Sequence, residues 1–195
     1  NLVIPSTVDG KIVTSIGDSA FKSCTSLTSV TFAEGSTLTT IGGSAFYGCK
    51  TLTSITIPSS VTSIGTDAFS DCSALTSVTF ADASTLTSIR DRAFCRCKTL
   101  TSIKIPSSVT SIDWYAFGGC TSLTSVTFAD ASTLTSISYS AFSDCTSLSA
   151  VYASENSSLA SALGSSFHYR NSCSDPNHDT TKSHYCKTSN SLFKF

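Results

Sequence analysis

The chain has 195 residues, of which 40% are hydrophobic and 13% are charged, and its formal net charge is −1. This length and apolar content are enough for one domain or one short repeat array with a continuous core. The chain has no block of Lys or Arg and no apolar run long enough to span a bilayer, so we expect neither nucleic acid as a partner nor a membrane span.

Two features of the composition bear on the compartment. Ser and Thr together make up more than a third of the chain, and a surface of hydroxyl groups in place of charges favours an extracellular or cell-surface protein. The first residues, Asn1 to Pro5, already lie within the repeat described below, and methionine is absent. We therefore expect a mature or trimmed fragment that other coils precede, whose compartment cannot be taken from a leader peptide.

An internal repeat organises most of the chain. The positions of successive Ala-Phe dipeptides differ by 25, 23, 25, 23 and 25, and a cysteine follows each Phe at the third position after it. The unit is a pair of one long and one short repeat, which differ in length in a single turn. A length change confined to one turn is typical of stacked coils, whose turns lie at the surface. The six Phe residues are Phe21, Phe46, Phe69, Phe94, Phe117 and Phe142.

Each repeat also contains the motif Leu-x-x-Ile/Val-x-Ile/Phe, as in residues 52–57 and 75–80. Its second half alternates apolar and polar residues, which predicts a half-buried strand, and in a solenoid such strands stack into a parallel sheet. The outward side chains form a uniform polar face, which suits a glycan, a repetitive polymer or a second copy of the solenoid. This candidate binding surface comprises Ser54, Thr56, Ser77, Thr79, Ser102, Lys104, Ser125 and Thr127, and is continued by Ala150 and Tyr152.

The second half of each repeat predicts the core. An apolar pair such as Val61 and Ile64 precedes each Ala-Phe, and the Phe rings are expected to stack into a column along the axis. No single repeat can bury such a ring alone. Ser, Thr and β-branched residues dominate throughout, so little helix is expected, and the back of each coil should be extended or a single short helical turn.

The sequence of residues 52–72, L-x-x-I-x-I-P-x-x-V-T-x-I-G-x-x-A-F-x-x-C, resembles the BspA-type, or Treponema pallidum-type, leucine-rich repeat. The resemblance covers about residues 1–148, with a weaker echo to Phe167. It implies a curved solenoid with a concave parallel sheet, built from alternating 25- and 23-residue coils, and a surface or secreted protein used for adhesion. We expect residues 1–167 to form this solenoid and residues 168–195 to form a C-terminal cap.

The six cysteines that follow the Phe residues are expected to be small buried thiols, although neighbouring coils would bring them within disulfide range. They are Cys24, Cys49, Cys72, Cys97, Cys120 and Cys145. Cys95 occupies the variable position between Phe94 and Cys97, so we expect it to be exposed. An exposed thiol is either reactive, a site of an intermolecular link, or an ordinary surface residue.

The C-terminal segment carries two further candidate sites. Cys173 and Cys186 are expected to form a disulfide, which would contribute about 3 kcal/mol. The alternative is a metal site with His178 and His184, but the spacing fits no familiar zinc module and we predict no metal. Asn156 begins a glycosylation sequon, which is usable if a eukaryotic cell secretes the protein.

The positions around Ala-Phe differ most between the copies. They share one edge of every coil, so Arg90, Arg92, Arg96, Trp114, Tyr115 and Tyr139 are expected to be neighbours there. Exposed Trp, Tyr and Arg together are typical of a binding hot spot, whereas neutral drift at solvent positions is the alternative. The Asp residues near the same edge are expected to be ordinary surface residues.

Catalysis has little support in the sequence. All three His residues lie in the tail, so the repeats cannot build a nucleophile–His pair, and no glycine-rich phosphate loop or cofactor motif is present. We expect a non-catalytic, surface or secreted recognition module that binds protein or glycan and needs no cofactor. The alternative is a structural subunit of a larger extracellular assembly, which would stack with further copies of itself.

Overall fold

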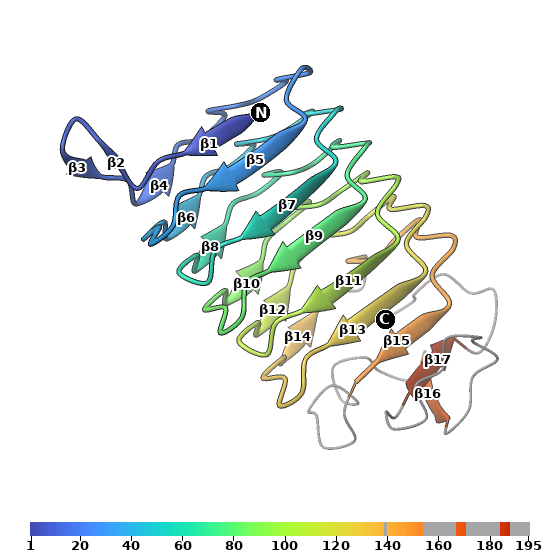
Figure 1. Ribbon diagram of the computed structural model, residues 1–195. Coiled ribbons are helices and arrows are strands. Elements are labelled where there is room, and N and C mark those ends of the chain that lie inside the picture. Colours follow the sequence, from blue (N-terminus) through green and yellow to red (C-terminus); the bar gives the residue numbers. More distant parts are fainter. Residues whose placement is uncertain (139, 154–166, 171–183, 188–195) are drawn as a thin grey trace.

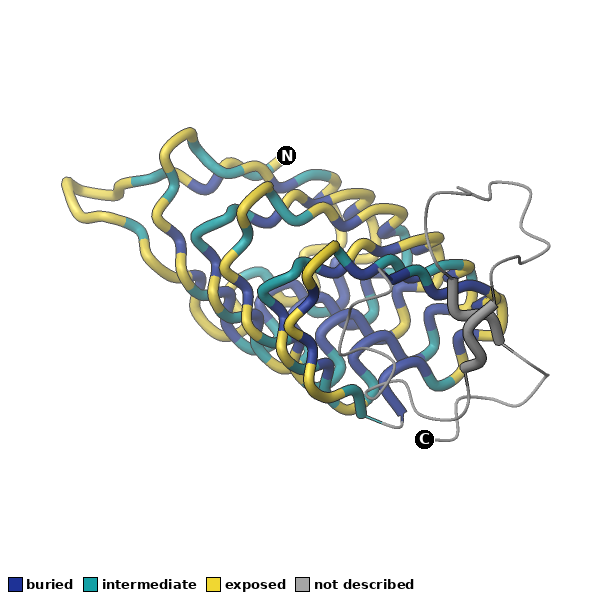
Figure 2. The backbone as a smooth tube through the Cα atoms, turned by 90° about the horizontal axis from the view of Figure 1, so that it is seen from below, coloured by how far each residue is buried: buried dark blue, intermediate teal, exposed yellow. Residues whose placement is uncertain are grey.

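The computed structural model describes residues 1–138, 140–153, 167–170 and 184–187. The chain winds into a solenoid whose strands run side by side along one axis (Figure 1), and no helix occurs among the described residues. Buried residues line the inside of the winding and exposed residues the outside, as Figure 2 shows in a view turned from that of Figure 1. The predicted repeat solenoid with little helix is therefore confirmed.

The long strands form one face of every coil. Neighbouring strands pair in parallel, and the register joins Ser29 to Ser54 and Ser54 to Ser77, so the sequence offset alternates between 25 and 23 as predicted. Figure 1 shows β9 and β11 side by side, which makes the face continuous. Its strands are β1 (Leu2–Ile4), β5 (Ser29–Phe32), β7 (Ser54–Ile57), β9 (Ser77–Phe80), β11 (Ser102–Ile105), β13 (Ser125–Phe128) and β15 (Ala150–Tyr152).

A second parallel sheet of two-residue strands forms the next face, where the sequence predicted only extended chain or a helical turn. Each strand ends on the second apolar residue of the pair that precedes Ala-Phe, such as Ile64 or Ile89, both of which are buried. Successive strands pair in register, for example Ile64 with Ile89. The strands are β4 (Ser15–Ile16), β6 (Thr40–Ile41), β8 (Ser63–Ile64), β10 (Ser88–Ile89), β12 (Ser111–Ile112) and β14 (Ser136–Ile137).

Antiparallel strands interrupt the pattern at both ends. Near the N-terminus, β2 (Thr7–Val8) and β3 (Lys11–Ile12) form a hairpin that extends away from the stack (Figure 1). At the other end, β15 pairs antiparallel with β17 (His184–Lys187), which in turn pairs with β16 (Phe167–Arg170). The predicted boundary between solenoid and cap, at 167/168, falls inside β16, and the capping role of residues 168–195 stays a prediction.

A column of phenylalanine rings runs through the core. The six Ala-Phe rings stack with centroid separations between 5.1 and 5.5 Å and nearly parallel planes. Four of these side chains are fully buried: Phe46, Phe69, Phe94 and Phe117. Offset stacking at this separation is a favourable arrangement for aromatic rings, and each ring needs the coils on both sides to lose its contact with water.

The third face of each coil, which we call the turn face, consists of residues 17–24, 42–49, 65–72, 90–97, 113–120 and 138–145. Its backbone amides donate alternately to the next coil and to their own coil. In the fourth coil, Arg92, Phe94 and Arg96 donate to carbonyl oxygens of the next coil at 2.7–2.9 Å, whereas the intervening Ala93, Cys95 and Cys97 donate within their own coil. The turn face is therefore a hydrogen-bonded layer that joins the coils, and not a loose set of loops.

Hydroxyl side chains also join successive coils. Thr99 donates to the carbonyl oxygens of Ser73 and Leu75 at 3.0 Å, and Ser108 donates to that of Leu86 at 2.7 Å. The same contact recurs along the whole stack, for example from Thr62, Thr76, Thr85, Thr110, Thr124 and Thr133. Much of the Ser and Thr content thus has a structural use, because these hydroxyls bind carbonyl groups of the preceding coil.

The repeats contain these free thiols: Cys24, Cys49, Cys72, Cys95, Cys97, Cys120 and Cys145. Five of them donate a hydrogen bond to the carbonyl oxygen of the Phe in the preceding coil, as Cys72 does to Phe46 at 3.2 Å. Cys24 differs from the other ladder cysteines because it lies in an outer coil and is exposed. Burial raises the pKa of the Cys72 thiol from its ordinary 9.0 to about 12 and also raises the pKa of Cys97.

The phenylalanine column predicts that the cost of removing a ring depends on its place in the stack. Replacing Phe94, which has a ring on each side, by Ala should lower the free energy of unfolding by about 3–5 kcal/mol. Phe21→Ala is the control and should cost clearly less, because Phe21 is only half-buried and stacks on one ring. Guanidinium unfolding followed by circular dichroism measures both values, and equal losses would contradict a core built on the column.

The raised thiol pKa values predict the chemistry of the cysteines. At pH 8 iodoacetamide should modify exposed Cys24 and leave Cys72 and Cys97 unmodified until the chain is denatured, as peptide mass spectrometry would show. The folded state binds these protons more tightly than the unfolded state. Stability should therefore be independent of the thiols below pH 9 and fall as the pH rises from 9.0 towards about 12. Labelling of Cys97 as fast as Cys24 would contradict this account.

Candidate functional site: a hollow on the turn face

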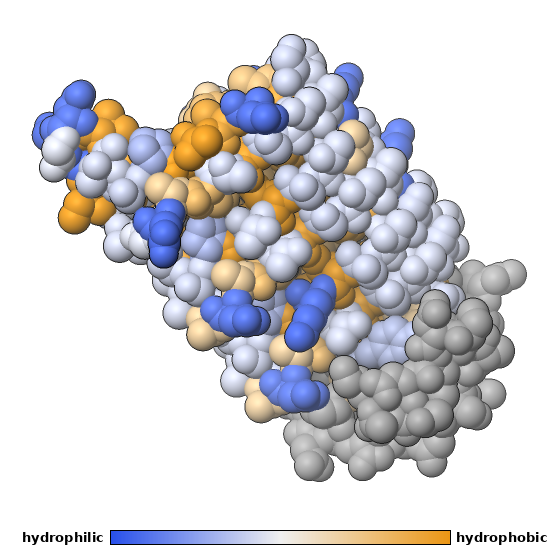
Figure 3. All heavy atoms as spheres, viewed as in Figure 1, coloured by the Kyte–Doolittle hydropathy of each residue, from blue (hydrophilic) through white to orange (hydrophobic). Residues whose placement is uncertain are grey.

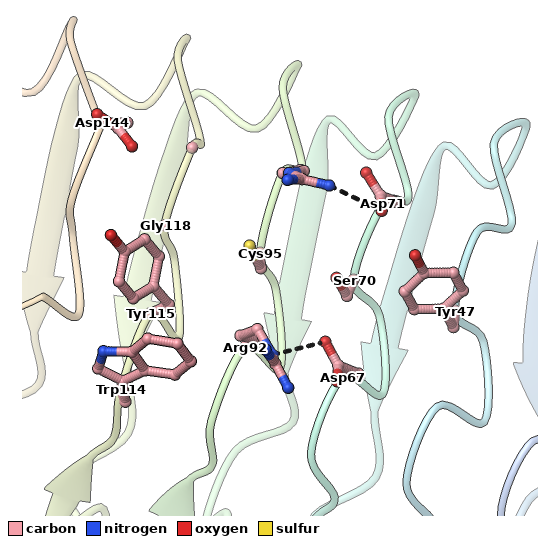
Figure 4. A pocket seen from close by; sticks show the side chains of 12 residues that line it. Tyr47, Asp67, Ser70, Asp71, Arg92, Cys95, Trp114, Tyr115, Gly118 and Asp144 are labelled. Atoms are coloured by element: carbon pink, nitrogen blue, oxygen red, sulfur yellow. Dashed lines mark ion pairs between the residues drawn. The ribbon is translucent and has the colours of Figure 1, made fainter.

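A hollow with a volume of about 450 Å³ opens on the turn face and extends from the second coil to the sixth. Figure 4 shows its side chains projecting from successive coils, with the sheets behind them. The lining residues are Tyr47, Asp67, Ser70, Asp71, Arg92, Cys95, Arg96, Trp114, Tyr115, Gly118, Gly119 and Asp144. Most of them occupy three positions of the repeat: the residue before Ala, the residue after Phe and the residue before Cys.

The floor of the hollow comes from the position after Phe. Here three successive coils carry the small residues Ser70, Cys95 and Gly118, all of which are buried. The prediction that Cys95 is exposed is therefore wrong, since its side chain is only 7% exposed. A short side chain at this position lies below the longer side chains around it, and the same burial raises the pKa of the Cys95 thiol.

Two ion pairs cross the hollow between adjacent coils (Figure 4). Arg92 Nε lies 3.2 Å from Asp67 Oδ1, and Arg96 lies 3.6 Å from Asp71 Oδ2. The two arginine side chains are 43% and 63% exposed, so each pair contributes at most about 1 kcal/mol to stability. Their chief effect is to place two planar donors beside two carboxylate acceptors at the mouth of the hollow.

Trp114 and Tyr115 of the fifth coil form one aromatic end of the hollow, and Asp144 of the sixth coil lies beyond them. Their rings meet edge to face with centroids 4.6 Å apart, and the guanidinium of Arg92 lies 5.4 Å from the centroid of the Trp114 ring. The Trp114 amide donates to Asp91 Oδ1 at 3.0 Å. Gly118 makes room for this arrangement, because a Cβ atom there would collide with the Tyr115 ring. Trp114 stays 42% exposed, so its ring is available for contact.

Tyr47 forms the opposite end, three coils away. A hydrogen bond to Asp71, together with the negative charge of this carboxylate, raises the pKa of Tyr47 above its ordinary 10.0. The Lys22 ammonium group lies 5.3 Å from the centroid of the Tyr47 ring. Asp71 therefore contacts both Tyr47 and Arg96. In the same way, Arg92 contacts both Asp67 and Trp114. These contacts form two polar rows across the hollow, between its aromatic ends.

Several lining residues hold a backbone conformation that their side chains disfavour. Arg92, Arg96 and Tyr115 have φ values of 53°, 57° and 53°, in the left-handed region. Other coils carry Ser, Asp or Gly at the same two positions, for example Ser44, Asp67 and Gly48. The left-handed conformation costs about 1 kcal/mol for a residue with a Cβ atom. The Arg and Tyr side chains are therefore present at a cost in stability, which favours a role in binding.

The structure brings most of the predicted edge residues together. Arg92, Arg96, Trp114 and Tyr115 line the hollow, whereas Arg90 is exposed outside it and Tyr139 lies outside the described residues. The acids Asp67, Asp71 and Asp144, which were expected to be ordinary surface residues, also line the hollow. The available signal was the repeat register, since Asp67 aligns with Arg92 and Asp71 with Arg96.

The second predicted surface, on the long strands, carries mostly small polar side chains. Figure 3 shows this face mostly in pale, weakly polar colours, with hydrophobic groups visible between them and a few strongly hydrophilic groups. Ser125 and Thr127 are half-buried, and Ala150, predicted to face outward, is buried where β15 pairs with β17. The remaining predicted residues are exposed and aligned by the strand register: Ser54, Thr56, Ser77, Thr79, Ser102 and Lys104.

The other predicted sites are not tested by the structure. Asn156 and Cys173 lie outside the described residues, as does the side chain of Cys186 in β17. Among the described residues, no group of three or more His, Cys, Asp or Glu is arranged to hold a metal ion. The described part of the chain also has no helix that is long and apolar enough to cross a membrane.

Alanine is ordinarily more stabilising than glycine, but the left-handed conformation of Arg92 predicts the reverse order of stability at this position. Arg92→Gly should be more stable than Arg92→Ala by about 1 kcal/mol, because both lose the ion pair but only glycine relieves the backbone. Arg90 is the matched control, since its φ is negative and Ala should be the better residue there. Thermal or guanidinium unfolding of the four variants measures the difference. If Arg92→Ala were the more stable of its pair, the left-handed assignment would be wrong.

Comparison with known proteins agrees with this architecture. The profile of the BspA type leucine rich repeat region matches residues 1–85 and 79–183, in six copies. The structure of a T. pallidum leucine-rich repeat protein is similar at 29% identity and a TM-score of 0.60, covering 69% of this chain and 67% of that one. No curated protein sequence shows significant similarity to the chain.

A leucine-rich cell surface protein from Faecalibacterium prausnitzii is similar at 32% identity and a TM-score of 0.60, over 88% of this chain. A leucine-rich repeat protein from Bacteroides ovatus is 29% identical over 77% of the chain, with a TM-score of 0.50. The chain covers 51% and 45% of these two proteins, or about half of their length. The repeat match, the alternating coil lengths and the stacked strands show that the chain belongs to the BspA-type leucine-rich repeat family.

Proposed function

We propose that this chain is a non-catalytic recognition module, secreted or on a cell surface, which binds a protein or a glycan through the turn-face hollow. The observation that carries the proposal is the gathering of unlike side chains in one hollow of an otherwise uniform scaffold. Trp, Tyr and Arg, the residues that dominate binding hot spots, meet there on adjacent coils. The left-handed φ values of Arg92 and Tyr115 add support, because the fold alone would favour other residues at those positions.

The rigidity of the turn face also suits recognition. Each coil below the hollow is hydrogen-bonded to the next through its backbone, so the side chains project from a fixed frame. A preorganised site loses little conformational entropy on binding. The long-strand sheet is equally hydrogen-bonded but offers mostly small hydroxyl groups, with the half-buried Tyr152 at its end.

The relatives and the composition support an extracellular or cell-surface location for the proposed function. One similar structure is that of a cell surface protein, and the low charge content favours an extracellular setting. A disulfide between Cys173 and Cys186 and glycosylation of Asn156 would fit the same setting and remain part of the proposal.

The proposed function predicts that binding depends on the hollow. The purified chain is applied to printed arrays of extracellular matrix proteins and of glycans, beside Trp114→Ala and the sheet control Thr56→Ala/Thr79→Ala. The binding signals of the wild-type chain should fall at least about tenfold in Trp114→Ala and persist in the sheet variant.

Circular dichroism and unfolding curves decide whether the comparison is valid. Trp114→Ala should remain folded and lose less than about 2 kcal/mol, because the side chain is 42% exposed. Arg92→Gly, which relieves its backbone, is a second hollow variant and should reproduce the loss of binding. Equal binding by the wild-type chain and both hollow variants would contradict the proposal.

A structural subunit of a larger extracellular assembly is the second candidate. The hydroxyl face of the long strands favours it, because Ser and Thr recur at the same positions, with Lys104 as an exception, and would match a second copy. Analytical ultracentrifugation separates the candidates: concentration-dependent growth that the sheet variant abolishes indicates assembly, and a monomer at all concentrations indicates recognition.

A further inference from the structure

We infer that the ligand of the turn-face hollow is an uncharged oligosaccharide, whose sugar rings pack against Trp114 and Tyr47 while its hydroxyls bind the two ion pairs between them. The inference rests on the proposed function and specifies its ligand. Three properties of the hollow support it: the balance of its charges, the placement of its aromatic rings and the state of its backbone groups.

The charges in the hollow largely neutralise one another. Asp67 is paired with Arg92 and Asp71 with Arg96, at 3.2 and 3.6 Å. Asp144 adds one exposed carboxylate at the far end. A strongly anionic or cationic ligand would have to compete with these internal pairs. Each protein charge that attracts it is paired with a protein charge that repels it. An uncharged ligand avoids this conflict.

The paired groups are well suited to hydroxyls. A sugar hydroxyl donates one hydrogen bond and accepts others, so it can donate to a carboxylate while it accepts from the neighbouring guanidinium. Arg92 Nε is itself buried against Asp67 at 3.2 Å, but the side chain as a whole is 43% exposed. A guanidinium carries five N–H donors, so a ligand hydroxyl can accept from the N–H groups of Arg92 that do not face Asp67.

The aromatic rings add an apolar contact at each end. A pyranose ring has an apolar face of C–H groups, which packs on an exposed aromatic face, and polar groups around its edge. Trp114 is the exposed ring at one aromatic end of the hollow, and Tyr47 forms the other end, three coils away. This separation is about 14 Å, since neighbouring strands lie roughly 4.8 Å apart. It exceeds the width of one sugar ring and therefore favours a short oligosaccharide.

The backbone of the hollow argues against an extended peptide. The amides of Asp71, Arg92 and Arg96 already donate to Cys95, Trp114 and Gly118 of the next coil, at 2.7–2.9 Å. A peptide that binds by strand addition needs unpaired backbone groups at an edge. The hollow offers side chains only, above a floor of small residues that leaves space for sugar rings.

The test uses Trp114, the only tryptophan of the chain, as the reporter. Its fluorescence is followed while the full chain is titrated with neutral trisaccharides: maltotriose, cellotriose, mannotriose and N,N′,N″-triacetylchitotriose. At least one should give a saturable change below about 10 mM, a range that includes millimolar dissociation constants. Added salt should leave the affinity unchanged, because the ligand is uncharged.

Two variants assign the signal to the hollow. Arg92→Gly should weaken the trisaccharide at least about tenfold, a loss of about 1.4 kcal/mol. Arg90→Ala, in the same coil but outside the hollow, should bind like the wild-type chain. Equal binding by Arg92→Gly and wild-type would overturn the inference.

The inference also fails if no trisaccharide changes the fluorescence, or if only oligolysine or oligoglutamate does so in a salt-dependent way. Its failure is distinguishable from that of the proposed function. Protein binding on the arrays that depends on Trp114, without any sugar response, would leave the recognition function in place and remove the oligosaccharide. Absence of all binding dependent on Trp114 would remove both.

Discussion

The whole structure depends on the requirement that each coil supply hydrogen-bonding partners and an apolar surface to the next. A single coil buries almost nothing alone, so its stability comes from the neighbouring coils. The requirement fixes the cross-section: strands on two faces, the turn layer on the third and the phenylalanine column inside. Variation is left to side chains that point outward, and the turn face is where these differ most.

The same requirement explains two features that otherwise look like surface properties. The abundant Ser and Thr are partly cross-coil hydrogen-bond donors, as Thr99 and Ser108 show, so their number reflects the stack as well as the environment. The left-handed residues of the turn face direct their amides to the next coil, as at Arg92 and Arg96. Gly meets this need without strain and Asp at reduced cost, as at Gly48 and Asp67. Ser44, Arg92 and Tyr115 meet it at the cost of a Cβ atom in the left-handed region.

The sequence predicted the features that depend on periodicity. The coil lengths, the long strands and the phenylalanine column follow from spacing alone, because the same register repeats. It did not predict the short-strand sheet, since two-residue strands have no pattern of their own. It also misplaced Cys95 and overlooked Asp67 and Asp71. The burial of Cys95 and the ion pairs of Asp67 and Asp71 depend on side chains of the adjacent coil, which are a full repeat away in the chain.

A rigid turn layer is the link between fold and proposed function, because it holds Trp114, Arg92 and the paired acids in one geometry. Native-state hydrogen exchange tests it most directly. Arg96 is exposed and Asp71 and Gly119 are half-buried, yet the amide of each donates to the next coil at 2.7–2.8 Å. They should exchange as slowly as the amides of Phe69 and Phe94 in the core. Exchange as fast as in an open loop would show that the turn face is not a hydrogen-bonded layer, and the account would fail.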